Sequence, residues 1–117
     1  MKENILRLKK KGHIEQVFKE GKSVATRNAV LYYKKNNLTK CRIAFSISKK
    51  IGKSVIRNRI RRLYYEIFRK MQNDIDSTYD FILIVRRKSK PLLTYEAVRQ
   101  DVRLLFKRAG LLKNRNR

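Results

Sequence analysis

The segment 80–86 constrains the fold of this chain most, because its centre is an uninterrupted apolar run from Phe81 to Val85. Such a run is typical of a strand that is buried on both faces of a sheet. The chain has 117 residues, which is enough for one hydrophobic core and little more. We therefore expect a single domain, residues 1–117, built around this strand.

Three helices are predicted from apolar residues that recur at helical spacing. The first lies within residues 13–20, and Gly21 follows it as a left-handed stop. The second spans about 54–71. The last begins at Thr94, whose side chain can cap the helix, and Gly110 would end it.

Two further strands are predicted before the middle helix. The stretch 24–35 contains a β-rich centre at 30–33, and a polar turn follows at 35–37. Residues 42–48 alternate large apolar residues with small or polar ones, as in a strand with one heavily buried face. The order α-β-β-α-β-α fits a small sheet with helices packed on it.

The charge of the chain indicates a polyanionic partner. There are 32 Lys and Arg residues against nine Asp and Glu residues, which gives a formal net charge of +23. Binding RNA, DNA or an anionic membrane would relieve the resulting self-repulsion. No apolar stretch approaches the ~20 residues of a spanning helix, and no signal peptide is visible. Cys41 is the sole cysteine, so a reducing, cytoplasmic location and a nucleic-acid partner are expected, with no membrane partner.

Basic residues are concentrated before and within the first turns of the middle helix. On a helical projection, apolar side chains from Ile56 to Met71 share one side, and the arginines fan around the rest. Guanidinium groups pair with two phosphate oxygens at once, and a helix N-terminus also favours phosphate. A face that only aids solubility would normally interleave acids. The predicted RNA-binding residues are Lys49, Lys50, Lys53, Arg57, Asn58, Arg59, Arg61 and Arg62.

No convincing catalytic set is visible. The triplets 21–23 and 52–54 resemble the end of a phosphate-binding P-loop, but each lacks the earlier glycine. His13 is the sole histidine, which leaves no histidine pair for a metal and only a remote chance of a Cys-His nucleophile. Three acids after the middle helix could hold magnesium, although a solvated loop explains them better: Asp74, Asp76 and Asp80.

The run 46–62 resembles the signature of the bacterial ribonuclease P protein component, with its Arg-Asn-Arg core at 57–59. Further segments match that family in the expected order: 7–10, 17–21, 23–25 with Arg27, and the apolar strand that ends in Arg86. The resemblance covers nearly the whole chain. It implies an α+β two-layer sandwich, similar to a domain of ribosomal protein S5, with a left-handed β-α-β crossover around the basic helix. Pattern alone would predict the right-handed form.

The resemblance also implies an activity. Ribonuclease P is an endonuclease that removes the 5′ leader from precursor tRNA, and its RNA subunit performs the hydrolysis with Mg²⁺. The expected partners are therefore the catalytic RNA subunit and precursor tRNA, with no protein partner required. Mg²⁺ would be held by the RNA subunit and the substrate, and none would be bound tightly by this chain.

The resemblance implies two contact surfaces. The Arg-Asn-Arg helix would face the catalytic RNA, and a cleft between the first helix and the sheet would take the single-stranded leader. The leader residues carried over are Ile14, Phe18, Val30, Tyr32, Ser46 and Arg86. Two positions depart from the family pattern: Ile14 replaces a frequent phenylalanine, and Thr26 replaces a common asparagine.

Three points stay open on the sequence alone. Phe18 and Tyr32 are either plain core residues or stacking platforms for unpaired bases, and the resemblance favours the second interpretation. A structural RNA-binding protein, such as a ribosomal component, is an alternative function. A DNA-compacting protein is less favoured, because it needs no apolar cleft.

Overall fold

The computed structural model describes residues 5–76, 78–86 and 94–113. The elements in chain order are β1 (Ile5–Arg7), α1 (Lys11–Glu20), β2 (Lys22–Ala25), β3 (Ala29–Lys35), β4 (Cys41–Ile47), the 3-10 helix η1 (Lys49–Ile51), α2 (Ser54–Lys70), β5 (Tyr79–Val85) and α3 (Tyr95–Ala109). The three predicted helices and three predicted strands are all present. β1 was not predicted, and the segment 24–35, predicted as one strand, is divided between β2 and β3.

One sheet carries the fold, with its strands in the order β1-β4-β5-β3-β2. β4 pairs in parallel with β5 and β1, whereas β3 pairs antiparallel with β5 and β2. β5 is thus the central strand. Its residues Phe81, Ile82 and Leu83 are at most 3% exposed. The prediction that segment 80–86 forms a strand buried on both faces is confirmed.

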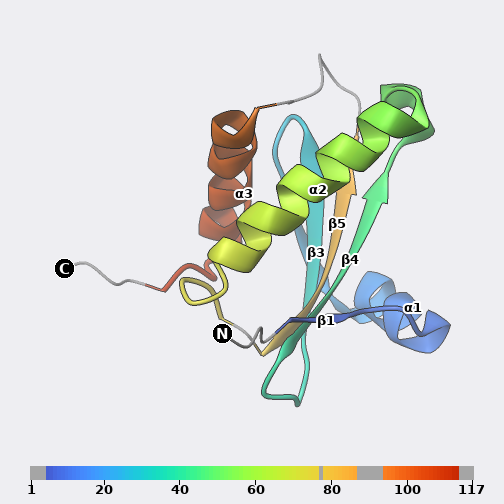
Figure 1. The fold of residues 1–117 in the computed structure, drawn as a ribbon. Helices are drawn as coiled ribbons and strands as arrows, with labels where there is room; N and C mark the ends of the chain where they lie inside the picture. The colour runs from blue at the N-terminus through green and yellow to red at the C-terminus, as the bar shows by residue number, and fades with distance from the viewer. Residues whose placement is uncertain (1–4, 77, 87–93, 114–117) are drawn as a thin grey trace.

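The crossover from β4 through α2 to β5 has the uncommon hand. In Figure 1, α2 lies in front of the sheet, both strands point upward, and β5 lies to the left of β4. A right-handed connection would place the second strand on the right. The left-handed crossover expected from the resemblance is therefore present.

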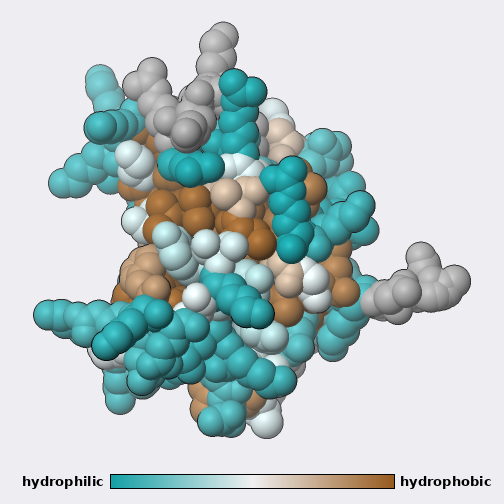
Figure 2. Space-filling view, turned by 180° about the vertical axis from the view of Figure 1, so that it is seen from behind, coloured by the Kyte–Doolittle hydropathy of each residue, from teal (hydrophilic) through white to brown (hydrophobic). Residues whose placement is uncertain are grey.

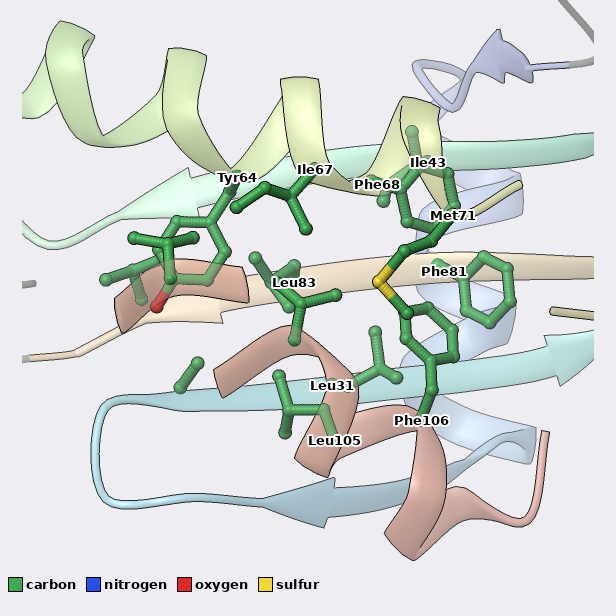
Figure 3. Packing of buried hydrophobic residues seen from close by; sticks show 14 of the residues in the cluster. Leu31, Ile43, Tyr64, Ile67, Phe68, Met71, Phe81, Leu83, Leu105 and Phe106 are labelled. Carbon is green, nitrogen blue, oxygen red and sulfur yellow. The ribbon is translucent and has the colours of Figure 1, made fainter. Parts of the chain in front are cut away.

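The larger core lies between the sheet and the layer formed by α2 and α3 (Figure 3). Phe81 of β5 sits at its centre, with ring centroids 5.5 Å from Phe68 of α2 and 5.2 Å from Phe106 of α3. Both contacts are edge-to-face, an arrangement that aromatic quadrupoles favour. Because α2 buries Ile60, Tyr64, Ile67 and Phe68 in this core, its basic side is directed away from the sheet.

The opposite face of the sheet carries α1 and a smaller core. Val17 of α1 is fully buried there against Leu8 and Ile82. Strand alternation separates the two cores, since Ile82 points away from the side that holds Phe81 and Leu83.

Gly21 ends α1, but the predicted left-handed conformation is wrong. Its φ of −83° and ψ of 179° are extended, so any residue could adopt them. The glycine is required by close approach instead, because a Cβ would lie 2.5 Å from the Val17 carbonyl oxygen and 2.6 Å from that of Tyr33. Gly110 ends α3 as predicted, in a left-handed conformation with φ 74°. The Thr94 hydroxyl accepts from Ala97 N at 3.3 Å, which confirms the predicted cap.

Asp80 corrects a second expectation, because it lies at 5% exposure in β5 and not in a solvated loop. Its carboxylate accepts hydrogen bonds from Arg42 at 2.8 and 2.6 Å and from Asn36 at 2.8 Å. Burial opposes ionisation, but these donors outweigh it and lower the pKa of Asp80. The third Arg42 nitrogen, Nη1, lies 2.8 Å from His13 Nδ1 of α1, so this network fastens α1 to the sheet.

Candidate nucleic-acid interface

The N-terminal end of α2 gathers backbone donors and basic side chains. No side chain caps the helix at Lys53, and its first turn contains no acid. The first backbone N–H groups of a helix have no partner within the helix, and the helix dipole adds partial positive charge there. Lys49, Lys50 and Lys53 are exposed around this end. The arrangement is suited to bind a phosphate group.

The Arg-Asn-Arg core is held in a defined geometry. Arg57 is half-buried, and its Nε donates to the carbonyl oxygen of Gly52 at 3.1 Å. One turn later, Arg61 Nη1 donates to Asn58 Oδ1 at 2.9 Å. The remaining arginines of this stretch, Arg59 and Arg62, are exposed. The stretch 49–62 contains no acid, so its own residues give it a strongly positive net charge.

The expected leader residues lie on the other face of the sheet, which we call the α1-side surface. It comprises Ile14 and Phe18 of α1 and the sheet residues Val30, Tyr32, Ser46, Ile84 and Arg86. Val30, Ile84 and Ser46 are direct neighbours in one row across β3, β5 and β4. Figure 2 shows this side of the molecule from behind, with brown apolar surface bordered by teal hydrophilic side chains. The structure thus brings the expected residues together.

Aromatic rings line the boundary between α1 and this row. Phe18 is 45% exposed, so it is not a core residue. Its ring meets that of half-buried Tyr32 edge-to-face, with the centroids 4.8 Å apart. Ile14 is half-buried and packs against the smaller core, which leaves it an apolar contact without a ring. A base stacked on Phe18 would lie directly beside the row of Val30 and Ile84.

Arg86 follows the last residue of β5 and lies at the C-terminal end of that strand. Its Nη2 donates to the carbonyl oxygen of Thr26 at 2.9 Å, while its Nε is buried without a hydrogen-bond partner in the part of the chain that the structure describes. Buried N–H groups are normally paired, so this nitrogen is an exception among the described residues. Thr26 itself is 6% exposed, and its hydroxyl accepts from Ala29 N at 3.2 Å. The Thr26 side chain therefore serves the turn between β2 and β3.

Ile84 belongs to the α1-side surface but was not among the residues predicted for it. The apolar run 81–85 hides the alternation that would have revealed it. Once Arg86 is assigned to this face, period-two alternation places Ile84 and Ile82 on it as well. Ile82 is covered by α1, whereas Ile84 is only partly buried.

The two surfaces meet at one end of the sheet. β4 and β5 are parallel, so their C-terminal ends lie together, where Ser48 N donates to Val85 O at 3.1 Å. η1 and the start of α2 follow Ser48, and Arg86 follows Val85. The basic groups at the start of α2 and the row of Val30, Ile84 and Ser46 thus lie near the same end of the sheet.

Within the described residues there is no group of three or more His, Cys, Asp or Glu side chains that could hold a metal ion. Asp76 is committed to Thr78, whose hydroxyl and backbone N–H donate to it at 2.7 and 3.0 Å and lower its pKa. No helix in the same part of the chain is long and apolar enough to cross a membrane.

Comparison with known proteins identifies the family. The model of the family Ribonuclease P matches residues 2–110. The chain belongs to the ribonuclease P protein family. It is 46% identical over 88 residues to the ribonuclease P protein component of Thermoanaerobacter sp. (strain X514), covering 75% of this chain and 76% of that protein. It is 36% identical over 117 residues to that of Caldanaerobacter subterraneus subsp. tengcongensis, covering 100% of both chains.

Solved structures give the same assignment. The ribonuclease P protein of Staphylococcus aureus superposes with a TM-score of 0.82 at 31% identity, covering 92% of this chain and 97% of that one. Family membership makes the chain an RNA-binding component of ribonuclease P, a tRNA-processing ribonucleoprotein with an RNA subunit. The mixed α+β fold expected from the sequence is confirmed.

Proposed function

We propose that this chain binds the catalytic RNA of ribonuclease P through the basic side of α2, and the 5′ leader of precursor tRNA through the α1-side surface. One observation carries the proposal: the two sets of residues occupy opposite faces of one sheet and meet at the C-terminal ends of β4 and β5. Two RNA segments could then contact the protein at once without competing for the same side chains.

Electrostatics support the assignment of α2 to the catalytic RNA. A folded RNA presents phosphates at high density, and each phosphate neutralised by Lys or Arg releases counterions and favours binding. The stretch 49–62 supplies lysines around a helix N-terminus and arginines over the following turns. Arg57 and Asn58 are already held by hydrogen bonds, so less side-chain entropy is lost when they bind.

The α1-side surface suits a single strand better than a duplex. Unpaired bases stack on aromatic side chains with little dependence on sequence, and Phe18 presents an exposed ring beside apolar sheet residues. Arg86 adds a half-buried guanidinium at the end of the row. A leader strand could place its bases against Phe18 and Val30 and its backbone near Arg86.

The chemistry of cleavage is assigned to the RNA subunit. Magnesium ions held by that RNA and the substrate would supply the activated water and stabilise the leaving oxygen. The side chains of this protein would bind and orient RNA, which raises substrate affinity and lowers the magnesium concentration needed. The part played by the protein is therefore greatest when magnesium is scarce.

Reconstitution tests this function. The catalytic RNA from the same organism is combined with the protein, and cleavage of precursor tRNA is measured at limiting Mg²⁺. The rate should exceed that of the RNA alone, and the excess should shrink as Mg²⁺ is raised. Binding of the RNA without any stimulation would contradict the proposal and favour a structural RNA-binding role, such as that of a ribosomal component.

A further inference from the structure

A groove of about 890 Å³ lies at the β1 edge of the sheet, between β1, β4 and α2. It arises because β1 is short: its three residues pair with Cys41, Arg42 and Ile43 of β4 and no further. Leu8 N still donates to Ile43 O at 3.0 Å, after which the chain turns into α1. Beyond Ile43, β1 no longer covers the edge of β4, and α2 passes above it.

Aromatic side chains form one wall of this groove. Phe45 projects from β4 toward α2, and its ring meets that of Tyr65 edge-to-face, with the centroids 6.1 Å apart and the planes at 73°. Tyr65 is 36% exposed, so much of its ring faces solvent. An edge-to-face pair of this kind leaves a flat ring surface for a further planar group.

The remaining lining is apolar along the floor, from Ile5, Leu6, Leu8, Ile14, Ile43 and Ala44. Its charged side chains are all basic, and none of the lining residues is acidic. Arg7 and Lys9 approach from the β1 side, whereas Arg61 and Arg62 approach from α2. The amide of Asn58 also lines the groove, and Arg61 fixes its orientation through the 2.9 Å bond to Oδ1. Side-chain amides of this kind read the edge of an exposed base.

Size and chemistry together define the occupant. Pockets for small organic groups occupy roughly 300–1,000 Å³, and this groove lies within that range. An acidic peptide would use the four cations but not the flat ring and the oriented amide. A paired duplex keeps its bases inside the stack and out of reach of a groove wall. An unpaired nucleotide would use all of these groups. Its base would stack on the Tyr65 ring, and its phosphates would lie between the basic side chains of the β1 side and those of α2.

We propose that this groove receives an unpaired nucleotide of the ribonuclease P RNA subunit, whose base stacks on Tyr65 and whose flanking phosphates contact Arg61 and Arg62. The inference rests on the proposed binding of that RNA by α2 and adds a specific site to it. Asn58 and Tyr65 lie seven positions apart, two helical turns, so both line the groove along the same side of α2. Recognition at this site is by shape and stacking, in addition to charge.

Chemical probing of the RNA subunit in the reconstituted holoenzyme tests the site. Base methylation and 2′-hydroxyl acylation are mapped with the wild-type protein and with Tyr65→Ala, Tyr65→Phe and Tyr95→Ala. Tyr95 is a matched control, because it is 39% exposed on α3 and does not line the groove. The wild-type protein should protect an unpaired nucleotide, Tyr65→Ala should lose that protection alone, and Tyr65→Phe and Tyr95→Ala should retain it.

Affinity gives a second readout. Loss of one base–aromatic stack should weaken binding of the RNA subunit by roughly 5- to 150-fold in Tyr65→Ala, and Tyr65→Phe should restore it. An identical protection pattern for Tyr65→Ala and the wild type would overturn the groove site, even if cleavage is still stimulated. Protection that depends on Tyr65 in the leader of added precursor tRNA, and not in the RNA subunit, would also overturn it. Absence of both stimulation and protection with the wild-type protein would instead contradict the proposed function.

Discussion

The hydroxyl of Tyr64 on α2 donates a 2.8 Å hydrogen bond to Asp101 Oδ2 on α3, and both side chains are buried. Burial and the neighbouring carboxylate raise the pKa of Tyr64, so the phenol keeps its proton and stays the donor. The bond joins the helix that carries the arginines to the helix packed beside it. It therefore helps to set the direction in which the basic side of α2 faces.

Replacing Tyr64 with phenylalanine should destabilise the fold by about 2 kcal/mol, because the buried Asp101 carboxylate loses a hydrogen bond. Urea denaturation at neutral pH measures the change. Tyr95→Phe is the control, since Tyr95 is 39% exposed and its hydroxyl can bond to water. Equal midpoints for the two variants would show that the Tyr64–Asp101 bond contributes no stability.

Gly21→Ala should destabilise the protein by about 1–3 kcal/mol, because the added Cβ would overlap backbone carbonyl oxygens of Val17 and Tyr33. Gly12→Ala in α1 is the opposite case. Nothing lies within 4 Å of its Cβ position, and a helix prefers alanine, so a gain of about 0.5 kcal/mol is expected. Thermal unfolding of both variants tests the pair, and a stable Gly21→Ala protein would contradict the close approach.

Asp80→Asn should cost about 3 kcal/mol at neutral pH, since it leaves the partly buried Arg42 guanidinium without its anion. The pKa of Asp80 is lowered in the folded state, so near pH 4 the unfolded chain binds more protons than the native one. The stability that Asp80 contributes is complete above its unfolded pKa of about 3.9 and is lost as pH falls through the folded pKa.

The difference in unfolding free energy between Asp80→Asn and the wild type should accordingly shrink in acid. Urea denaturation over a pH series measures it. Glu96→Gln serves as the control, because the pair of Glu96 with Arg99 is exposed on α3 and should leave the midpoint unchanged. A difference that stays constant down to pH 2 would show that folding does not lower the pKa of Asp80.

Arg57→Ala combined with Arg59→Ala should weaken binding of the catalytic RNA and reduce its salt dependence. Each lost phosphate contact lowers the slope of log K against log salt by roughly 0.7–0.9. The matched control replaces Arg103 and Lys107, two exposed basic residues of α3, and its slope should equal that of the wild type. An unchanged slope in the α2 variant would show that these arginines do not contact phosphate.

In the reconstituted holoenzyme, Phe18→Ala should weaken the binding of precursor tRNA that carries a leader by roughly 5- to 150-fold. The binding of mature tRNA should stay unchanged. Leu38→Ala is the control, since Leu38 is a similarly exposed apolar residue, at 40% against 45%, in the turn before β4. Equilibrium binding of both tRNA forms measures the effect. Equal weakening for the two ligands, or a marked loss of thermal stability, would return Phe18 to a structural role.

The helices were predictable because each buries an apolar stripe, and α3 also has a local start and stop. Thr94 and Gly110 act through bonds and dihedral angles within their own turn, so sequence identifies them. β1 could not be found in this way, because three residues carry no period and form a strand only by pairing with β4, far along the chain. The reason for a glycine at position 21 was predicted wrongly. The Tyr33 carbonyl oxygen that leaves no room for a Cβ there belongs to β3, which local sequence does not place beside Gly21.

The binding residues were predicted by type, and their placement needed the fold. The arginine-rich stretch 49–62 is visible as unbalanced charge, which is a property of the sequence. Ile84 was hidden inside a continuous apolar run, and Asp80 looked like a loop acid until Arg42 and Asn36 were placed beside it. Contacts between distant segments decide which apolar residue is exposed and which acid is buried.

Successive side chains along β4 and β5 alternate between the two faces of the sheet, so the register of these strands decides which residues belong to each surface. Odd-numbered residues from Phe81 to Val85 belong to the core beneath α2, and the even-numbered residues between them face α1. One inserted or deleted residue in either strand would exchange the sets, burying polar positions and exposing the core. We expect relatives to conserve the lengths of these strands strictly, while the exposed turn at 37–40 tolerates insertions.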